Sequence, residues 1–335
     1  SLLDQAHEEA FRARLPAGFA VETEPHPGDW IDLIKAVRRV PVKVLERRKE
    51  APDLTMDERV FGSLRHTWRP DLVALRSDRL LLVTPVARPS RIARCLSLGE
   101  LVCTALDALF DVKADAAPLL DPLHVQLFES LEEYLARTAA DRRTSEAGLR
   151  ALATTVGHYD PEANLSRLFV PAGDDRFDGV LETVAHEMTH HWVDQRMPRP
   201  PECQHRRYTG ASPNYFLEEG LATMVEEFRF DLEARTFEPF NPRADSLDVV
   251  ANAKDLLPFD RVIELSQLEF HRLSREPVHE VPFRWTLGSH RRLSDANLYY
   301  AQAGAVCHWL WNADGGKRRD VLLQMMLCIT VFHLS

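Results

Sequence analysis

The chain has 335 residues, of which 45% are hydrophobic and 27% are charged, a composition typical of a folded globular protein. Its formal net charge of −10 argues against the basic surface that nucleic acids and anionic membranes require, so we expect no nucleic-acid partner. No stretch reaches the roughly 20 consecutive apolar residues of a membrane-spanning helix, so we expect no transmembrane segment.

The 5 cysteines are widely spaced and include no CxxC pair. This pattern indicates neither a disulfide framework nor a cysteine zinc site, and we expect small buried thiols. The set comprises Cys95, Cys103, Cys203, Cys307 and Cys328. Because the chain begins at Ser1 without a methionine, two compartments stay open for a soluble protein: the cytoplasm, or export with a signal peptide already removed.

Residues 1–70 mix short helical patterns with prolines and carry no recognisable chemistry. They predict an N-terminal flank or cap of unknown role. The remaining residues, 71–335, predict one domain that starts with a sheet part at 71–175. Two helices at 177–229 and a helical subdomain at 230–335 follow.

Alternating and apolar patterns predict the elements of the sheet part. Residues 72–86 favour two strands around a polar turn, and residues 90–110 have the apolar spacing of a helix. A strand at 123–128 precedes a helix that starts from a serine cap at Ser130. Two further strands, in TTVGHYD and NLSRLFVP, are joined by a turn at DPEAN.

Helical patterns dominate the rest of the chain. A helix at 177–195 ends before the prolines of MPRPPE, and the next helix starts from Ser212 as N-cap and Pro213 as first helical residue. Later helices are expected within DRVIELSQL, LYYAQAGAVCHWLW and KRRDVLLQMMLC, and the sequence leaves open whether the natural domain continues past Ser335. The fold class is therefore α+β, a small mostly antiparallel sheet followed by a helical half.

The motif HEMTH, residues 186–190, lies inside the helix at 177–195. Positions i and i+4 share one helix face, so His186 and His190 can bind one metal ion through imidazole nitrogens. Glu187 is offset by about 100° and cannot join them as a ligand, but it can reach a water beside them. A row of Val184, Met188 and Trp192 predicts a buried opposite face.

A catalytic zinc site needs a third protein ligand. The pair HEMTH and FLEEGLA resembles the gluzincin (HExxH...E) zinc metallopeptidases, whose third ligand comes from an (N/E)-E-G-x-A motif on a second helix. The resemblance implies Glu219 as that ligand, with Glu218 as the competing choice, and Gly220 where two helices approach closely.

The strand pair GHYDPEANLSRLFVP and the segment YYAQAGAVCHWLWNADGGKRRDVLL resemble the peptidase-MA-like domain of poorly characterised bacterial gluzincins. The similarity covers about residues 75–330. It implies a zincin-like fold, in which the sheet packs on the HExxH helix with an edge strand above it and the Y-A-Q helix behind the site.

The resemblance implies a zinc-dependent peptidase with one Zn²⁺ per chain, held by His186, His190 and Glu219, with Glu187 as general base. The substrate would be a peptide or protein, which the strand NLSRLFVP could pair with and align. The G-x-M-E-N motif of the aminopeptidases is missing, so an endopeptidase is favoured. Two alternatives stay open: a catalytically inactive zincin-fold binding or scaffold protein, and an amide hydrolase of narrow specificity.

Related gluzincins often stabilise the oxyanion with a tyrosine or histidine from the helical half. Tyr299 and Tyr300 lie about 100° apart around the helix, so only one of them is expected to face the zinc. The Y-A-Q alignment selects Tyr300 for this catalytic role. Core packing is the alternative for Tyr300.

Other polar residues near the motifs have structural or supporting interpretations. His191 is expected at the surface or behind the ligands, and His158 on a strand close to the site. Glu226 and Glu227 are expected to support the ligands or to be solvated. His205 and His308 are expected to be structural.

Overall fold

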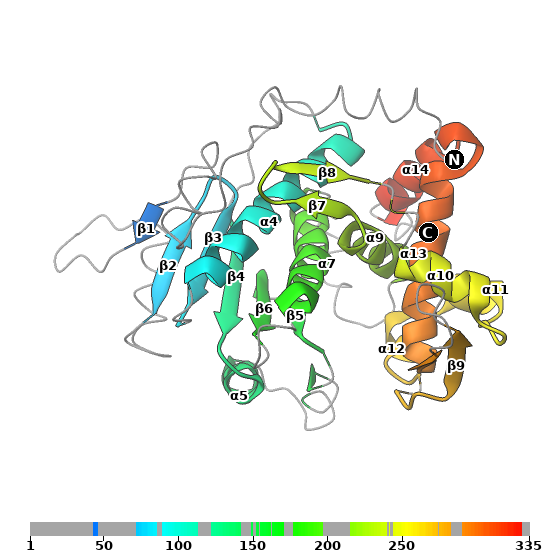
Figure 1. Ribbon diagram of the computed structural model, residues 1–335, viewed down its shortest axis with the longest axis horizontal. Coiled ribbons are helices and arrows are strands. Elements are labelled where there is room, and N and C mark those ends of the chain that lie inside the picture. The colour runs from blue at the N-terminus through cyan, green and yellow to red at the C-terminus, as the bar shows by residue number, and fades with distance from the viewer. Residues whose placement is uncertain are drawn as a thin grey trace.

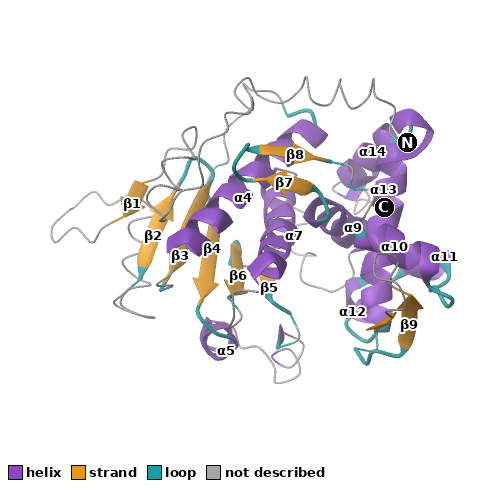
Figure 2. Ribbon diagram, viewed as in Figure 1, coloured by secondary structure: helices purple, strands orange, loops and turns teal. Residues whose placement is uncertain are grey.

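The computed structural model describes the following residues: 43–45, 72–85, 89–112, 122–141, 149, 152–153, 155–161, 163–170, 177–196, 215–239, 241, 244–273, 275–282 and 290–329. Within them the protein is α+β, as predicted. Figure 1 shows a sheet on one side, a helical half on the other, and helix α7 between them. Figure 2 shows the strands of this sheet gathered apart from the later helices.

The main sheet of the described residues has six strands in the order β1-β2-β3-β4-β6-β5. The strands are β1 (Lys43–Leu45), β2 (Val73–Arg76), β3 (Leu80–Thr84), β4 (Leu123–Phe128), β5 (Gly157–Asp160) and β6 (Leu165–Phe169). All except β1 fall where the sequence predicts strands. β1 comes from the flank at 1–70, and the rest of that flank lies outside the described residues.

The sheet is mixed, so the prediction of a mostly antiparallel sheet is correct only for its outer parts. β1–β2, β2–β3 and β5–β6 are antiparallel, whereas β3–β4 and β4–β6 are parallel. The parallel centre has a physical cause, because a helix connects β3 to β4 and another follows β4. Such a crossover returns the chain in the same direction.

Helices cover both faces of the sheet. α4 (Pro89–Leu109) and α7 (Phe177–Arg196) pack on one face, where Leu82 and Val125 share a core with Leu106 and Val184. α5 (Leu131–Asp141) packs on the other face through a small aromatic cluster. Ser130 caps α5 as predicted, accepting a 3.2 Å hydrogen bond from the Glu133 amide.

The helical half comprises α9 (Tyr215–Glu226), α10 (Asp245–Asn252), α11 (Phe259–Glu264), α12 (Gln267–Phe270), α13 (Asp295–Gly316) and α14 (Arg319–Ile329). The segment predicted as one helix at 260–268 is two, because Ser266 forms a capping box with Glu269 and starts α12. Two hairpins here were not predicted: β7 (Arg229–Asp231) with β8 (Thr236–Glu238), and β9 (His279–Pro282) with β10 (His290–Leu293).

Helix α9 approaches α13 closely at Gly220, as the sequence predicted. A Cβ atom at this position would lie 2.5 Å from the carbonyl oxygen of Ala303, which is backbone and cannot rotate away. Glycine therefore sets the distance between the two helices.

Among the described residues, no helix is long and apolar enough to cross a membrane. Cys95, Cys103 and Cys307 are buried free thiols, as expected. Cys203, His205 and the predicted cap residues 212–213 lie outside the described residues, as does the side chain of Cys328.

Candidate metal centre

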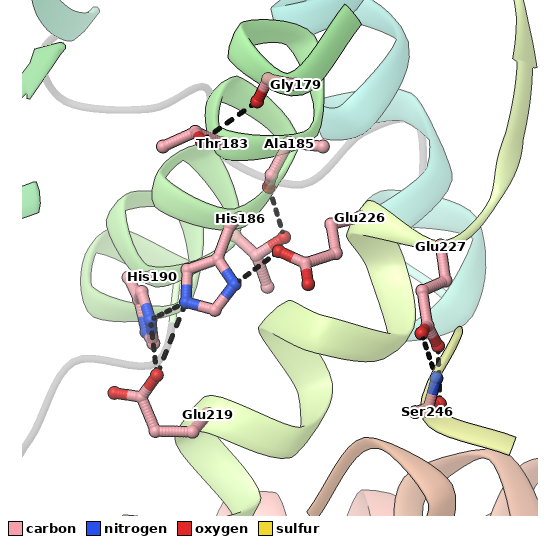
Figure 3. Close-up of polar contacts among 10 residues, drawn as sticks. Gly179, Thr183, Ala185, His186, His190, Glu219, Glu226, Glu227 and Ser246 are labelled. Carbon is pink, nitrogen blue, oxygen red and sulfur yellow. Dashed lines mark hydrogen bonds and ion pairs between the residues drawn. The ribbon is translucent and has the colours of Figure 1, made fainter. Parts of the chain in front are cut away.

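The HEMTH motif lies on α7 with one face buried and the other turned toward the helical half. Val184, Met188 and Trp192 are at most 2% exposed, as predicted for the buried row. The Trp192 indole donates a 3.1 Å hydrogen bond to Asp107 of α4, which fixes the rotation of α7 about its axis. His186 and His190 then point away from the sheet toward α9 (Figure 3).

Helix α9 packs against α7 and brings Glu219 to the two histidines (Figure 3). His186 Nε2 lies 3.1 Å from His190 Nε2 and 3.3 Å from Glu219 Oε2. Glu219 Oε2 also lies 3.5 Å from His190 Nε2. Within the described part of the chain, these three side chains form a group able to hold a metal ion.

The spacing of these donor atoms fits a tetrahedral metal ion. Metal–nitrogen bonds of about 2.0–2.1 Å at tetrahedral angles separate neighbouring donors by roughly 3.3–3.5 Å. The three observed separations, 3.1, 3.3 and 3.5 Å, are close to this value. Two imidazoles and a carboxylate are also a donor set that zinc prefers.

A second observation comes from the other ring nitrogen of His186. Its Nδ1 lies 2.7 Å from Glu226 Oε2, so it donates its proton to that carboxylate. In a neutral ring the lone pair of Nε2 then faces the oxygen of Glu219, and two acceptors in contact repel unless a cation lies between them. The arrangement therefore requires positive charge at the centre of the group.

The protonation tendencies of the group agree with this requirement. Burial lowers the pKa of His186, but the carboxylates of Glu226 and Glu219 outweigh burial and raise it well above its ordinary value. Burial also lowers the pKa of His190, but the carboxylate of Glu219 outweighs burial and the net shift is upward. Burial raises the pKa of Glu219, but the two histidines outweigh it and the net shift is downward.

Glu187 lies beside the ligand group but outside it. Its side chain is buried, and burial raises its pKa, while the positive charges of His186 and His190 act in the opposite direction. The backbone N–H of Tyr159 on β5 donates to its carboxylate. A buried carboxylate with a raised pKa is suited to accept and return a proton.

Strand β5, rather than β6, is the outer strand next to α7. The prediction that NLSRLFVP could pair with a peptide is wrong, because β6 is paired on both sides, with β4 and β5. The ring of Tyr159 stacks on His191 at 4.7 Å, and its hydroxyl donates a 2.9 Å hydrogen bond to Asp194. These contacts hold β5 against α7.

Two other histidines near the motif contact Ser166 of β6 and Tyr134 of α5 and lie outside the ligand group. His191 is fully buried and its Nδ1 lies 3.3 Å from the Ser166 hydroxyl, so it is not a surface group. His158 lies on β5, with its Nδ1 2.6 Å from the hydroxyl of Tyr134 on α5. Both therefore contribute contacts to the sheet.

Glu226 and Glu227, which the sequence did not separate, have different partners. Glu226 contacts His186, whereas Glu227 accepts hydrogen bonds of 2.5 and 2.6 Å from the amide and hydroxyl of Ser246. Glu227 also lies 2.9 Å from Nε2 of His308 on α13, which gives that histidine the structural contact expected of it. The spacing of seven residues from Glu219, two turns on one face, could have identified Glu226.

The remaining predicted residues lie as follows. Glu218 is not part of the metal-binding group. The ring of Tyr300 lies 5.9 Å from that of His186, whereas Tyr299 is fully buried beside Phe270. Tyr215, which the sequence analysis missed, donates its hydroxyl to Glu219 from one turn earlier on α9.

Comparison of the sequence with models of protein families, and with curated proteins, found no match. The geometry offers three ligands for a divalent cation, one buried carboxylate beside them, and a tyrosine next to His186.

Proposed function

We propose that the protein is a zinc-dependent peptidase of the gluzincin type, with a zincin-like fold and one Zn²⁺ per chain. The observation that carries the proposal is the triangle of donor atoms of His186, His190 and Glu219, with Glu187 beside it. The resemblance of HEMTH and EEGLA to gluzincin motifs supports the same conclusion.

Zinc bound by this group would act as a Lewis acid toward the scissile carbonyl and lower the pKa of a water toward about 7. Glu187 is suited to take the proton of the attacking water and return it to the leaving amine, because its carboxylate is buried and its pKa is raised. Glu226 orients His186, and Tyr215 orients the carboxylate of Glu219.

The outer edge of β5 is the proposed place for an extended substrate. The N–H of Phe169 donates to the C=O of Val156, so the alternation of an antiparallel pair turns the backbone groups of Gly157 and Tyr159 away from β6. The N–H of Tyr159 donates to Glu187, so the edge at Gly157 lies close to that carboxylate. Pairing along this edge would lay a peptide next to Glu187, using main-chain bonds that depend little on side chains. Because the sequence lacks the G-x-M-E-N motif of the aminopeptidases, we favour an endopeptidase.

A cleavage assay with a broad peptide library, combined with metal analysis, tests the proposal. We expect one zinc per chain and cleavage of a subset of peptides. The Glu187→Gln variant should keep its zinc and its fold while kcat falls by on the order of 10²-fold or more, because the general base is lost.

Each other outcome selects a different function. Absence of zinc after loading, or a Glu187→Gln variant as active as the parent, contradicts the mechanism. Zinc without cleavage of any peptide favours a scaffold protein or an amide hydrolase of narrow specificity.

A further inference from the structure

An exposed cation, Arg275, lies at the rim of the candidate metal centre. Its Cζ atom lies 4.7 Å from the centre of the Phe270 ring, a cation–π contact. Phe270 is buried and its ring lies 5.1 Å from that of Tyr300. Tyr300 in turn contacts His186, with ring centres 5.9 Å apart. Two aromatic rings therefore connect the guanidinium to the first ligand.

Arg275 is exposed and forms no ion pair among the described residues. The charged groups around the two histidines are largely acidic, namely Glu187, Glu219 and Glu226. A cation beside such a group is normally balanced by one of its carboxylates. Here the guanidinium of Arg275 lies over an aromatic ring and has no carboxylate partner among the described residues, so its N–H donors can bind a ligand that arrives from solution.

The electrostatic effect of Arg275 reaches the site. Burial and the Glu219 carboxylate raise the pKa of the Tyr300 hydroxyl, and Arg275 opposes them more strongly than Glu187 or Glu226 adds to them. Burial and the charge of Arg275 lower the pKa of His271, also at the rim, while Glu219 acts in the opposite direction. The guanidinium therefore lies near the hydroxyl of Tyr300 and not on a remote surface.

We propose that Arg275 binds a carboxylate of the substrate, so that the protein prefers peptides with a negative charge close to the cleaved bond. The proposal rests on the peptidase function and names its substrate class. Guanidinium binds carboxylate through two parallel hydrogen bonds, a geometry that fixes both position and direction. The three contacts of 4.7, 5.1 and 5.9 Å place the guanidinium within about five extended residues of His186.

The carboxylate can come from two sources, the C-terminus of a peptide or an acidic side chain. One cleaved peptide from the library, or its strongest binder if none is cleaved, is therefore synthesised in three forms. The first has a C-terminal amide and no acidic residue, and the second a free C-terminal acid. The third has the amide and one glutamate, moved through the five positions on each side of the cleaved bond.

Two measurements are made on each form. The first is kcat/KM with the zinc-loaded parent and its Arg275→Gln and Arg275→Lys variants. The second is calorimetric binding to zinc-loaded Glu187→Gln, with and without Arg275→Gln. Arg272→Gln is the matched control, because Arg272 is exposed on the same segment but is not among the charges that act on Tyr300 or His271.

We expect the acid form or one glutamate form to be favoured about tenfold over the neutral form, mainly through KM. Arg275→Gln should abolish this preference, Arg275→Lys should keep part of it, and Arg272→Gln should keep all of it. The proposal is overturned if the parent shows the same kcat/KM and affinity for all three forms, or if Arg275→Gln keeps the preference for the acidic forms.

The failures of the two proposals are distinguishable. Cleavage without any charge preference overturns only the role of Arg275. Charge-selective binding that is lost in Arg275→Gln, without any cleavage, supports the carboxylate site and contradicts the peptidase. Absence of both cleavage and binding overturns both.

Discussion

The Nδ1 atom of His186 lies 2.7 Å from Glu226 Oε2, on the far side of the ring from the Nε2 atom that faces His190 and Glu219 (Figure 3). A carboxylate that accepts the Nδ1 proton fixes the tautomer, so the Nε2 lone pair is always directed at the metal position. It also makes the imidazole a stronger base. Helix α9 therefore carries both Glu219, which lies at Nε2 of His186, and Glu226, which orients the ring of His186 from Nδ1.

Glu226→Ala should weaken zinc binding by roughly 10- to 100-fold, the range for loss of a group that orients a ligand. Glu226→Gln should weaken it less, because its amide oxygen can still accept the Nδ1 proton. Competition with a chelator measures the affinity. Glu264→Ala, which removes an exposed carboxylate of α11, is the control and should bind zinc as the parent does.

The third ligand is tested by comparing two neighbouring glutamates. Glu219→Ala should lose zinc steeply, because Glu219 Oε2 lies 3.3 and 3.5 Å from the two histidine nitrogens. Glu218→Ala should change zinc affinity little, because Glu218 is outside the group. Metal content after dialysis decides between them, and a reversed ranking would make Glu218 the ligand.

The packing of α9 on α13 gives a prediction about stability. Gly220→Ala should lower the free energy of unfolding by about 1–3 kcal/mol, because the new Cβ would lie 2.5 Å from a backbone oxygen of Ala303. Gly179→Ala is the control within α7, where a Cβ would meet nothing within 4 Å. It should leave stability unchanged or raise it by up to about 1 kcal/mol. Urea unfolding of the zinc-free proteins measures both, and equal effects would contradict close packing at Gly220.

A partly buried histidine on β4 gives a prediction about pH. Burial, aided by the charge of Arg167, lowers the pKa of His124 from 6.5 to about 4. Between these values the unfolded chain binds a proton that the folded protein does not, so stability falls as the pH falls through this window. From pH 7 to pH 5 the parent should lose about 1–2 kcal/mol more than His124→Gln does. Urea unfolding at the two pH values, with a chelator present, tests this, and parallel losses would rule out the contribution of His124.

The sequence predicted that His186, His190 and Glu219 lie together, because most of their arrangement is local. His186 and His190 share a face by helix geometry, and Glu219 belongs to a short motif on one helix. The parallel pairing of the central strands depends on contacts between residues far apart in the sequence. The helix expected between β3 and β4 is nevertheless typical of parallel pairing and could have indicated it.

Contacts that depend on how α7, α9 and α13 cross could not be predicted. The bond from His186 to Glu226 joins residues on different helices, and so does the contact of Glu227 with His308. The sequence could place Glu226 two turns after Glu219, but it could not show which neighbour that face meets. The same limit explains why the sequence did not identify β5 as the edge strand and did not indicate a role for Arg275.

The last prediction concerns the hydroxyl of Tyr300. Attack on a carbonyl builds negative charge on its oxygen, and a preorganised donor near the metal can stabilise that charge. The ring of Tyr300 lies 5.9 Å from that of His186. Burial and Glu219 raise the pKa of this hydroxyl well above its ordinary value, so it keeps its proton and can donate it in a hydrogen bond. We therefore expect Tyr300→Phe to lower kcat by roughly 10- to 1000-fold with KM and the melting temperature nearly unchanged.

Tyr299→Phe is the matched control for this substitution. Tyr299 is fully buried, and its hydroxyl has no hydrogen-bond partner among the described residues. Loss of that hydroxyl should therefore leave kcat unchanged and should not reduce stability, because an unpaired buried polar group is removed. Steady-state kinetics and thermal unfolding of both variants give the comparison. If Tyr300→Phe keeps its kcat, or loses thermal stability while kcat stays normal, Tyr300 is a packing residue of α13 and the oxyanion donor must come from another element.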